Sequence, residues 1–233
     1  MRLDRYLSNV TTLTRSQAQK AICGGRVSVD GEPQKQPSLN VMEAAAVSLD
    51  GGLVARHEPR YFMLHKPEGY VCSTEPELHP GVLDLLDEAT AMGLHFVGRL
   101  DIDTTGLLLI TDDGAWSHRI LAPARKCSKR YLVTLAESLS ERDAERLRQG
   151  ILLCSEARPT KPVQLQLVSS NSCRLTITED RYHQVKRMFA ALGNRVVVLH
   201  RERIGALQLD PDLSPGNYRA LTEDEISGIF AEP

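Results

Sequence analysis

Six short apolar runs lie between residues 61 and 200, and each is rich in branched or aromatic side chains. Runs of this length and composition predict β-strands, here at 61–65, 107–111, 130–135, 162–168, 174–178 and 196–200. Helix signals are fewer: they lie at 115–122, at 141–149 between Ser140 and Gly150, and at 183–192 before Gly193. Because strands outnumber helices and several are joined by short connections, the pattern favours an α+β fold with a mixed, mostly antiparallel sheet flanked by helices over a doubly wound parallel sheet.

The first sixty residues predict a small separate module. Four apolar residues at helical spacing from Leu3 to Val10 give a first helix one apolar face. Thr14 and Gln17 have the spacing of a capping box and predict the start of a second helix, which would end at Gly24-Gly25.

Two short hairpins are expected after these helices. The segment 27–29 alternates into an Asp30-Gly31 turn, and a strand at 47–49 meets a second turn at 50–52. The charged segment 56–62 contains Pro59 and has the composition of a linker. We therefore expect two domains, at 1–58 and 59–233.

The composition is that of a soluble globular protein, with 42% hydrophobic and 25% charged residues among 233. No apolar run approaches the roughly 20 residues that a membrane span needs, and charges occupy the N-terminus where a signal peptide would be apolar. The sequence therefore predicts a cytoplasmic protein with no membrane partner.

Metal and cofactor motifs are not apparent. The five cysteines and seven histidines are scattered rather than spaced as zinc ligands, and no glycine-rich phosphate-binding loop is present. We expect reduced cysteines, no metal and no organic cofactor.

The charge is strongly segregated, although the net charge is only −2. Residues 1–26 hold five basic residues and one acid, residues 119–130 hold five and no acid, and residues 181–203 hold six and one. Residues 75–114 instead hold nine acids and one base. Three basic blocks of this kind suggest a polyanion, such as nucleic acid, as partner.

The stretch "GRLDIDTTGLLLITDDG" at 98–114 concentrates four carboxylates. One alternative is a phosphatase of the haloacid-dehalogenase type, with Asp101 as nucleophile and Asp103 as acid/base beside magnesium. That motif should close an apolar strand, whereas here the apolar run follows the motif. A metal-free alternative places Asp101 between Arg99 and a turn at 104–106, whose donors would keep the carboxylate ionised and aimed. Asp112 and Asp113 precede Gly114 and have the pattern of a helix cap.

The N-terminal pattern resembles a known RNA-binding module. The segments "MRLDRYL", "LTRSQAQKAI" and "GRVSVDG" are similar to the alpha-L RNA-binding domain. The resemblance implies that basic residues on its two helices bind RNA phosphates. Thr12 stands where the family usually has a glycine, before the second helix.

The rest of the chain resembles the pseudouridine synthases of the RsuA type, which act on bacterial small-subunit ribosomal RNA. Four motifs occur in the order of that family, followed by "GNYRALTEDEI" near the end; they are "HKPEGYVCS" (65–73), "GRLDIDTTGLLLITDDG" (98–114), "KRYLVTL" (129–135) and "RYHQVKRMFAALG" (181–193). The resemblance implies a catalytic domain that isomerises a specific uridine of 16S ribosomal RNA to pseudouridine after flipping the base.

The same resemblance implies roles for individual residues. Asp101 matches the catalytic aspartate, Tyr131 the active-site tyrosine and Lys186 the basic residue that pairs with the aspartate. Supporting residues of the active site are expected around Asp101, at Arg99, Leu100, Thr104, Thr105 and Gly106. RNA contacts are expected from Arg2, Arg5, Arg15, Lys20, Arg26, Lys66, Lys129, Arg130, Arg181, His183, Gln184 and Arg187.

One further departure and two alternatives remain open. The family usually reads "EGR" where this chain has Glu179, Asp180 and Arg181, and an aspartate would tolerate a left-handed turn there. The alternatives are a non-catalytic RNA-binding protein of ribosome assembly, and a synthase acting on large-subunit ribosomal RNA. We expect a monomer whose partner is 16S ribosomal RNA or a small-subunit assembly intermediate.

Overall fold

The computed structural model describes residues 1–42, 44–54, 58–73, 78–122, 125 and 127–231. It divides into two compact units, Met1–Pro59 and Arg60–Pro233. Part of the expected linker, at 55–57, lies outside the described residues, as do Glu75, Glu77 and Lys126 of the charged blocks.

The first unit packs two helices against a small antiparallel sheet. The helices are α1 (Leu3–Val10) and α2 (Arg15–Cys23), and the strands β1 (Val27–Val29), β2 (Glu32–Gln34), β3 (Val47–Leu49) and β4 (Gly52–Leu53) pair in the order β2-β1-β3-β4. Thr14 and Gln17 form the predicted capping box. The hairpins turn at Asp30-Gly31 and Asp50-Gly51, where all four residues have positive φ. A separate core holds this unit together, and Leu3, Leu7 and Ile22 are its most buried large side chains.

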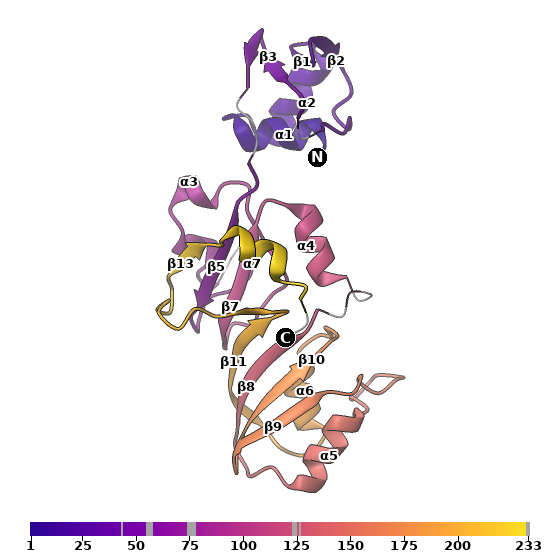
Figure 1. Cartoon of the computed structure of the whole chain (residues 1–233), viewed down its shortest axis with the longest axis vertical. Helices are drawn as coiled ribbons and strands as arrows, with labels where there is room; N and C mark the ends of the chain where they lie inside the picture. The colour runs from indigo at the N-terminus through magenta and orange to yellow at the C-terminus, as the bar shows by residue number, and fades with distance from the viewer. Residues whose placement is uncertain (43, 55–57, 74–77, 123–124, 126, 232–233) are drawn as a thin grey trace. The chain divides into compact units, whose positions relative to one another are not determined.

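The second unit is built on a nine-stranded sheet (Figure 1). The main order is β13-β5-β7-β11-β8-β10-β9, with β12 paired to β11 and β6 to β7. Among the described strands only β7 and β11 pair in parallel, so the predicted mixed, mostly antiparallel sheet is confirmed. The strands are β5 (Tyr61–Lys66), β6 (His95–Phe96), β7 (Thr104–Thr111), β8 (Lys129–Leu135), β9 (Gln164–Ser169), β10 (Ser172–Ile177), β11 (Val196–Ile204), β12 (Leu207–Gln208) and β13 (Tyr218–Ala220).

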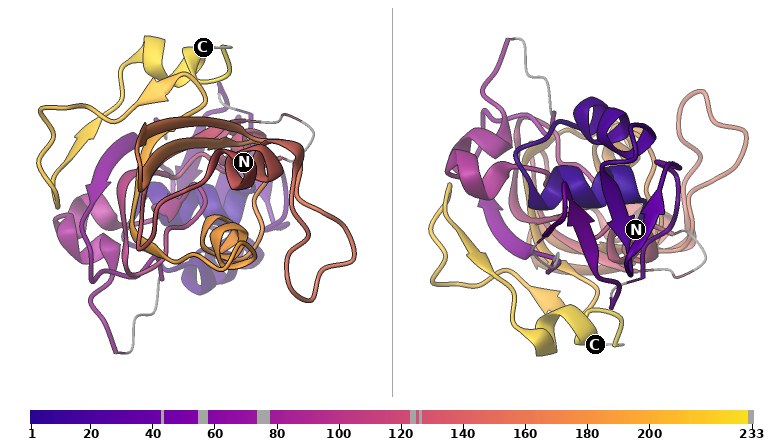
Figure 2. Two further views of the ribbon diagram at one scale, coloured as in Figure 1. Left: turned by 90° about the horizontal axis from the view of Figure 1, so that it is seen from below. Right: turned by 90° about the horizontal axis from the view of Figure 1, so that it is seen from above.

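Five α-helices and one short 3-10 helix accompany this sheet in the described part of the unit. They are η1 (Val82–Leu85), α3 (Glu88–Ala91), α4 (Gly114–Leu121), α5 (Glu141–Gln149), α6 (Gln184–Ala190) and α7 (Glu223–Gly228). Figure 2 shows α5 and α6 on the same side of the sheet. Leu147 of α5 and Phe189 of α6 are fully buried there with Val133 and Leu175 of the strands. The segment between α5 and β9 forms a long projecting loop (Figure 2).

All six predicted strands and all three predicted helices of this unit are present, with ends shifted by a few residues. The end of β11 lies at Ile204 rather than at residue 200, and β7 begins at Thr104 rather than at residue 107. The Thr104-Thr105-Gly106 sequence predicts a turn, but pairing with β11 makes these residues part of the strand. Sequence reasoning also missed the short elements η1, α3, β6, β12, β13 and α7.

Candidate active site

Asp101 lies in a turn that leads directly into β7. The turn is closed by the amide of Thr104, which donates to the carbonyl of Asp101 over 3.1 Å. The expected turn at 104–106 is therefore wrong: these residues are already in the strand. Their side chains do not hold Asp101 either, because the Thr105 hydroxyl lies 2.8 Å from Nδ1 of His200 and the buried Thr104 hydroxyl has no hydrogen-bond partner.

Gly106 is required where β7 meets β11. Its φ is +105°, and a Cβ atom at this position would lie 2.4 Å from the carbonyl oxygen of Arg201. Such a contact is far inside van der Waals distance, so only glycine lets the two strands approach this closely.

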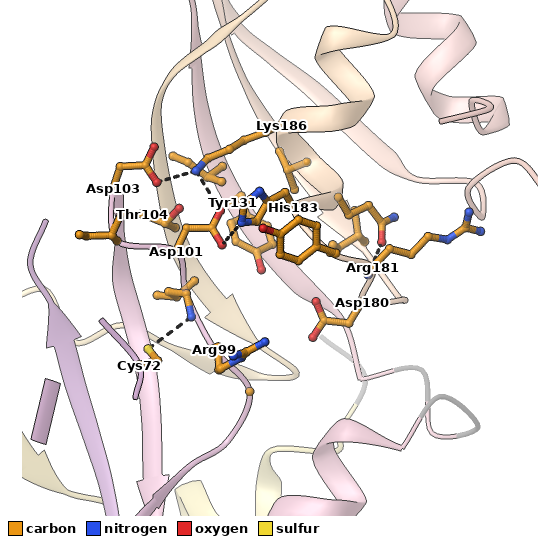
Figure 3. A pocket seen from close by; sticks show the side chains of 18 of the residues that line it. Cys72, Arg99, Asp101, Asp103, Thr104, Tyr131, Asp180, Arg181, His183 and Lys186 are labelled. Carbon is orange, nitrogen blue, oxygen red and sulfur yellow. Dashed lines mark hydrogen bonds and ion pairs between the residues drawn. The ribbon is translucent and has the colours of Figure 1, made fainter. Parts of the chain in front are cut away.

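Lys186 of α6 joins two carboxylates. Its Nζ lies 2.8 Å from Oδ2 of Asp101 and also contacts Oδ1 of Asp103 (Figure 3). Burial alone would raise the pKa of Asp103, but the hydrogen bond from Lys186 and its charge hold that pKa below the ordinary value. Burial likewise opposes the charge of Lys186, and the two carboxylates more than offset it, so its pKa is raised. Sequence reasoning assigned Asp103 no role beside Lys186, although its place two residues after Asp101 was a usable signal.

His183 precedes α6 in a left-handed conformation, with φ 47° and ψ 36°. Positive φ is uncommon for residues other than glycine, although histidine, asparagine and aspartate adopt it more often than the rest, and such residues cluster at functional sites. Nε2 of His183 lies 3.3 Å from Oδ1 of Asp101, and the imidazole stacks on Tyr182 with ring centroids 3.8 Å apart. The departure from "EGR" predicts a left-handed turn at Asp180. The structure has the left-handed conformation at His183 instead, so this prediction is wrong.

A cleft of about 930 Å³ opens beside these residues. Tyr131 of β8 forms part of its wall and is 6% exposed, while Leu100 is also buried and lines it. Arg99 lines the cleft from an exposed position. The volume is sufficient for a nucleoside-sized ligand. The cleft therefore combines one aimed carboxylate, a lysine that neutralises it, and a flat aromatic wall.

The model of the RNA pseudouridylate synthase family matches residues 60–191. The chain belongs to this family. The S4 domain model matches residues 1–44, which confirms the RNA-binding module predicted at the N-terminus. The phosphatase alternative for Asp101 and Asp103 is thereby excluded, and the chain is an RNA pseudouridine synthase.

Full-length relatives support the same family. Ribosomal small subunit pseudouridine synthase A of Salmonella typhimurium strain LT2 is 53% identical over 230 residues, covering 98% of this chain and 100% of that protein. The protein of the same name from Escherichia coli strain K12 is 52% identical with the same coverage. A solved structure described as a crystal structure of pseudouridylate synthase aligns with a TM-score of 0.73 and 47% identity, over 98% of this chain and 99% of the other.

Two residues expected to contact RNA are buried inside the synthase unit. Lys66 is fully buried, and its Nζ donates to the backbone carbonyls of Pro67, Ile102 and Thr104 over 3.0, 3.3 and 2.9 Å. Burial lowers its pKa. Gln184 is 4% exposed and donates to Glu179. The assignment of Lys66 as an RNA contact is therefore wrong, and Lys66 instead fixes the turn that carries Asp101. Gln184 fixes the start of α6 and also lines the cleft, so its contact with RNA stays a prediction.

Other expected RNA contacts of this unit are half-buried or buried and paired with acids. Lys129 lies 3.1 Å from Asp180, and Arg130 lies 3.0 Å from Glu202. Arg181 and Arg187 both pair with Glu156, at 3.3 and 3.0 Å, and so attach the projecting loop to the segment that carries His183. Local charge counts overstated the free positive charge here, because the acids that neutralise these residues come from distant segments.

Basic residues of the S4 domain gather around a buried acid. Asp4 is fully buried and accepts from Arg2, Gln19 and the amide of Arg5, with Arg15 3.4 Å away. Burial alone would raise the pKa of Asp4, but these partners hold it well below the ordinary value. Arg26 pairs with Asp50 at the protein surface, and Lys20 is exposed.

The two remaining aspartates of the 98–114 stretch have structural positions. Asp113 accepts from the amides of Ala115 and Trp116 and caps α4, as predicted. Asp112 is fully buried and accepts from the Nε of Arg60 over 2.8 Å. It therefore anchors the start of β5 rather than capping the helix.

In the part of the chain that the structure describes, no three His, Cys, Asp or Glu side chains come together as metal ligands. Among the same residues, no helix is both long enough and apolar enough to cross a bilayer.

Proposed function

We propose that this chain isomerises one uridine of bacterial 16S ribosomal RNA to pseudouridine, with Asp101 as the catalytic carboxylate. The observation that carries the proposal is the Asp101 carboxylate held 2.8 Å from Lys186 at a cleft walled by Tyr131. The small-subunit substrate is supported by the relatives that are more than 50% identical over their whole length and are named for that activity.

The reaction breaks the bond between C1′ of the ribose and N1 of uracil and forms a bond between C1′ and C5. The hydrogen on C5 leaves as a proton and N1 gains one, so there is no net redox change or hydrolysis. An ionised carboxylate beside the sugar can act as nucleophile or as general base. Asp101 is the candidate because its Oδ2 lies 2.8 Å from Nζ of Lys186 and only 27% of its side chain is exposed.

Lys186 positions Asp101. Its Nζ also contacts Asp103, so the ammonium is held from two sides, and His183 lies 3.3 Å from the other carboxylate oxygen of Asp101. Tyr131 offers its ring as the surface on which the detached base rotates, and its burial keeps water away from that surface.

The target base lies within folded RNA, so it must be flipped out to enter the cleft. Tyr182 is 73% exposed beside the cleft and stacks on His183, an arrangement suited to stacking against an unpaired base. Arg99 is placed to meet a phosphate at the cleft edge. We also propose that the basic face of the S4 domain, with Arg2, Arg5, Arg15, Lys20 and Arg26, binds more distant phosphates.

We propose further that the domains divide at 58/59 and that the protein acts as a cytoplasmic monomer without metal or cofactor. Its partner would be 16S ribosomal RNA or an assembly intermediate of the small subunit.

Tritium release from ribosomal RNA labelled at uracil C5 tests the reaction. We expect release from 16S RNA or a small-subunit particle, and pseudouridine missing from one 16S position in cells that lack the protein. Loss of a large-subunit pseudouridine instead would favour the large-subunit alternative, and no release from any substrate would favour the non-catalytic assembly protein. Release abolished by EDTA and restored by magnesium, on RNA of unchanged fold, would contradict the cofactor-free proposal.

A further inference from the structure

Arg203 of β11 is a largely buried cation whose Nε has no hydrogen-bond acceptor. It is 8% exposed, its Nε is buried without a hydrogen-bond acceptor, and it makes no ion pair with any residue that the structure describes. Burial and the neighbouring charge of Arg130 lower its pKa. Burying an unpaired charge costs several kcal/mol, so a guanidinium in this state calls for an anion from outside the chain.

Two further arginines are linked to this position through β8 and Glu202. Arg130 of β8 is the register partner of Arg203. Glu202 accepts from Nε of Arg174 over 3.1 Å and lies 3.0 Å from Nε of Arg130. The Nη groups of Arg130 and Arg174 make no hydrogen bond to any described residue. We call Arg130, Arg174, Glu202 and Arg203 the arginine patch; it holds three guanidinium groups and one carboxylate.

The arginine patch faces away from the cleft. Successive residues of a strand point to opposite faces of the sheet, and Tyr131, which follows Arg130, lines the cleft. Arg174 of β10 pairs with Leu132, two residues after Arg130, so it shares the face of Arg130. Figure 1 shows β8, β10 and β11 together in this part of the sheet. The side chains of Arg130 and Arg174 are 27% and 41% exposed, so a ligand can reach them from solvent.

We infer that the arginine patch binds a phosphate group of the ribosomal RNA, at a site separate from the catalytic cleft. This inference rests on the proposed function for the identity of the RNA. Guanidinium Nη groups match phosphate oxygens in a bidentate geometry. The patch carries two more positive charges than negative ones. Glu202 accepts a hydrogen bond from Nε of Arg174 and forms an ion pair with Arg130, whose buried Nε has no hydrogen-bond acceptor.

The test compares Arg174→Gln, Arg203→Met and the double variant with Arg146→Gln as control. Arg146 is an exposed arginine of α5 that pairs with Asp143. Binding of a long 16S fragment is measured by filter retention at several salt concentrations. The double variant should bind at least about 5-fold more weakly near 0.1 M salt, and the slope of log K against log salt should fall by about one, the value for one lost phosphate contact. The control should leave both unchanged.

Two readouts separate phosphate binding from a structural role. Arg203→Met removes a largely buried charge whose Nε has no hydrogen-bond acceptor, so its melting temperature should equal or exceed that of the parent while RNA binding weakens. Tritium release from a short oligonucleotide that fills only the cleft should be unchanged in Arg174→Gln. An unchanged salt slope in the folded double variant, or a lower melting temperature of Arg203→Met with unchanged RNA binding, would overturn the inference. Failure of the parent to release tritium would refute the proposed reaction. It would not refute phosphate binding by the arginine patch, because the filter assay measures RNA binding and does not depend on turnover.

Discussion

Lys186→Met should slow the reaction without unfolding the enzyme, because methionine keeps most of the unbranched side chain and removes its charge. At 2.8 Å from Asp101, and with an effective dielectric constant of about 20, the Coulomb energy of the pair is about 6 kcal/mol. The side chains of Lys186 and Asp101 are 26% and 27% exposed, so water screens part of this energy. Loss of one partner costs about 1 kcal/mol for exposed pairs and about 3–5 kcal/mol for buried ones.

A value of about 2 kcal/mol is appropriate for this half-buried pair, which corresponds to a roughly 30-fold slower chemical step. Single-turnover tritium release at saturating RNA measures that step. Lys186→Arg, which retains the charge, should recover part of the loss. Lys161→Met is the matched control, because no described residue bonds the Lys161 side chain, and it should react at the parental rate.

The chemical step should be affected more than the affinity for RNA, since Lys186 acts through Asp101. A rate within about 3-fold of the parent in folded Lys186→Met would show that the pair does not hold Asp101 for catalysis, and would refute this reasoning.

Three other changes test the fold and the RNA-binding module. Gly106→Ala should lower the free energy of unfolding by about 3–5 kcal/mol in a denaturation assay, because of the clash with Arg201 and the positive φ. Gly193→Ala, with open space around it, should lower it by about 1 kcal/mol in the same assay. The pKa of Asp4 is depressed from 3.8, so the ionised carboxylate stabilises the S4 domain above that pH, and this stabilisation is lost as the pH falls below it. Asp4→Asn should remove this acid-dependent stabilisation and lower the free energy of unfolding of the S4 domain by about 1–3 kcal/mol at pH 7. An unchanged dependence of stability on acid pH in this variant would contradict the stabilising role of Asp4. Removal of residues 1–58 should weaken RNA binding and flatten its salt dependence while the remaining unit stays folded, since each unit has its own core; equally tight binding by the shortened chain would show that the S4 domain does not bind the RNA.

The elements that could be predicted are those whose causes are local. The capping box of Thr14 and Gln17 and the turn at Asp30-Gly31 depend on residues within a few positions, and both are present as predicted. The start of β7 could not be predicted, because Thr104 is extended only through pairing with β11, about 95 residues away in the sequence.

The candidate site shows the same division. Motif order identified Asp101, Tyr131 and Lys186, which the fold brings to one cleft. The burial and the bonding partners of other charged residues could not be predicted from the sequence, because they depend on tertiary contacts. Lys66 has the sequence context of a surface base, yet three backbone carbonyls surround it.

Asp101→Asn tests the central claim most directly, because the substitution keeps the shape of the side chain and removes only its charge and basicity. Tritium release by the purified variant should fall by at least the roughly 10²–10⁴-fold typical of general acid–base residues, while its fold and RNA affinity are retained. Asp113→Asn is the matched control, since an amide oxygen can still accept from the amides of Ala115 and Trp116, and its turnover should stay near the parental value. Near-normal turnover in folded Asp101→Asn would contradict the assignment of Asp101 as the catalytic carboxylate.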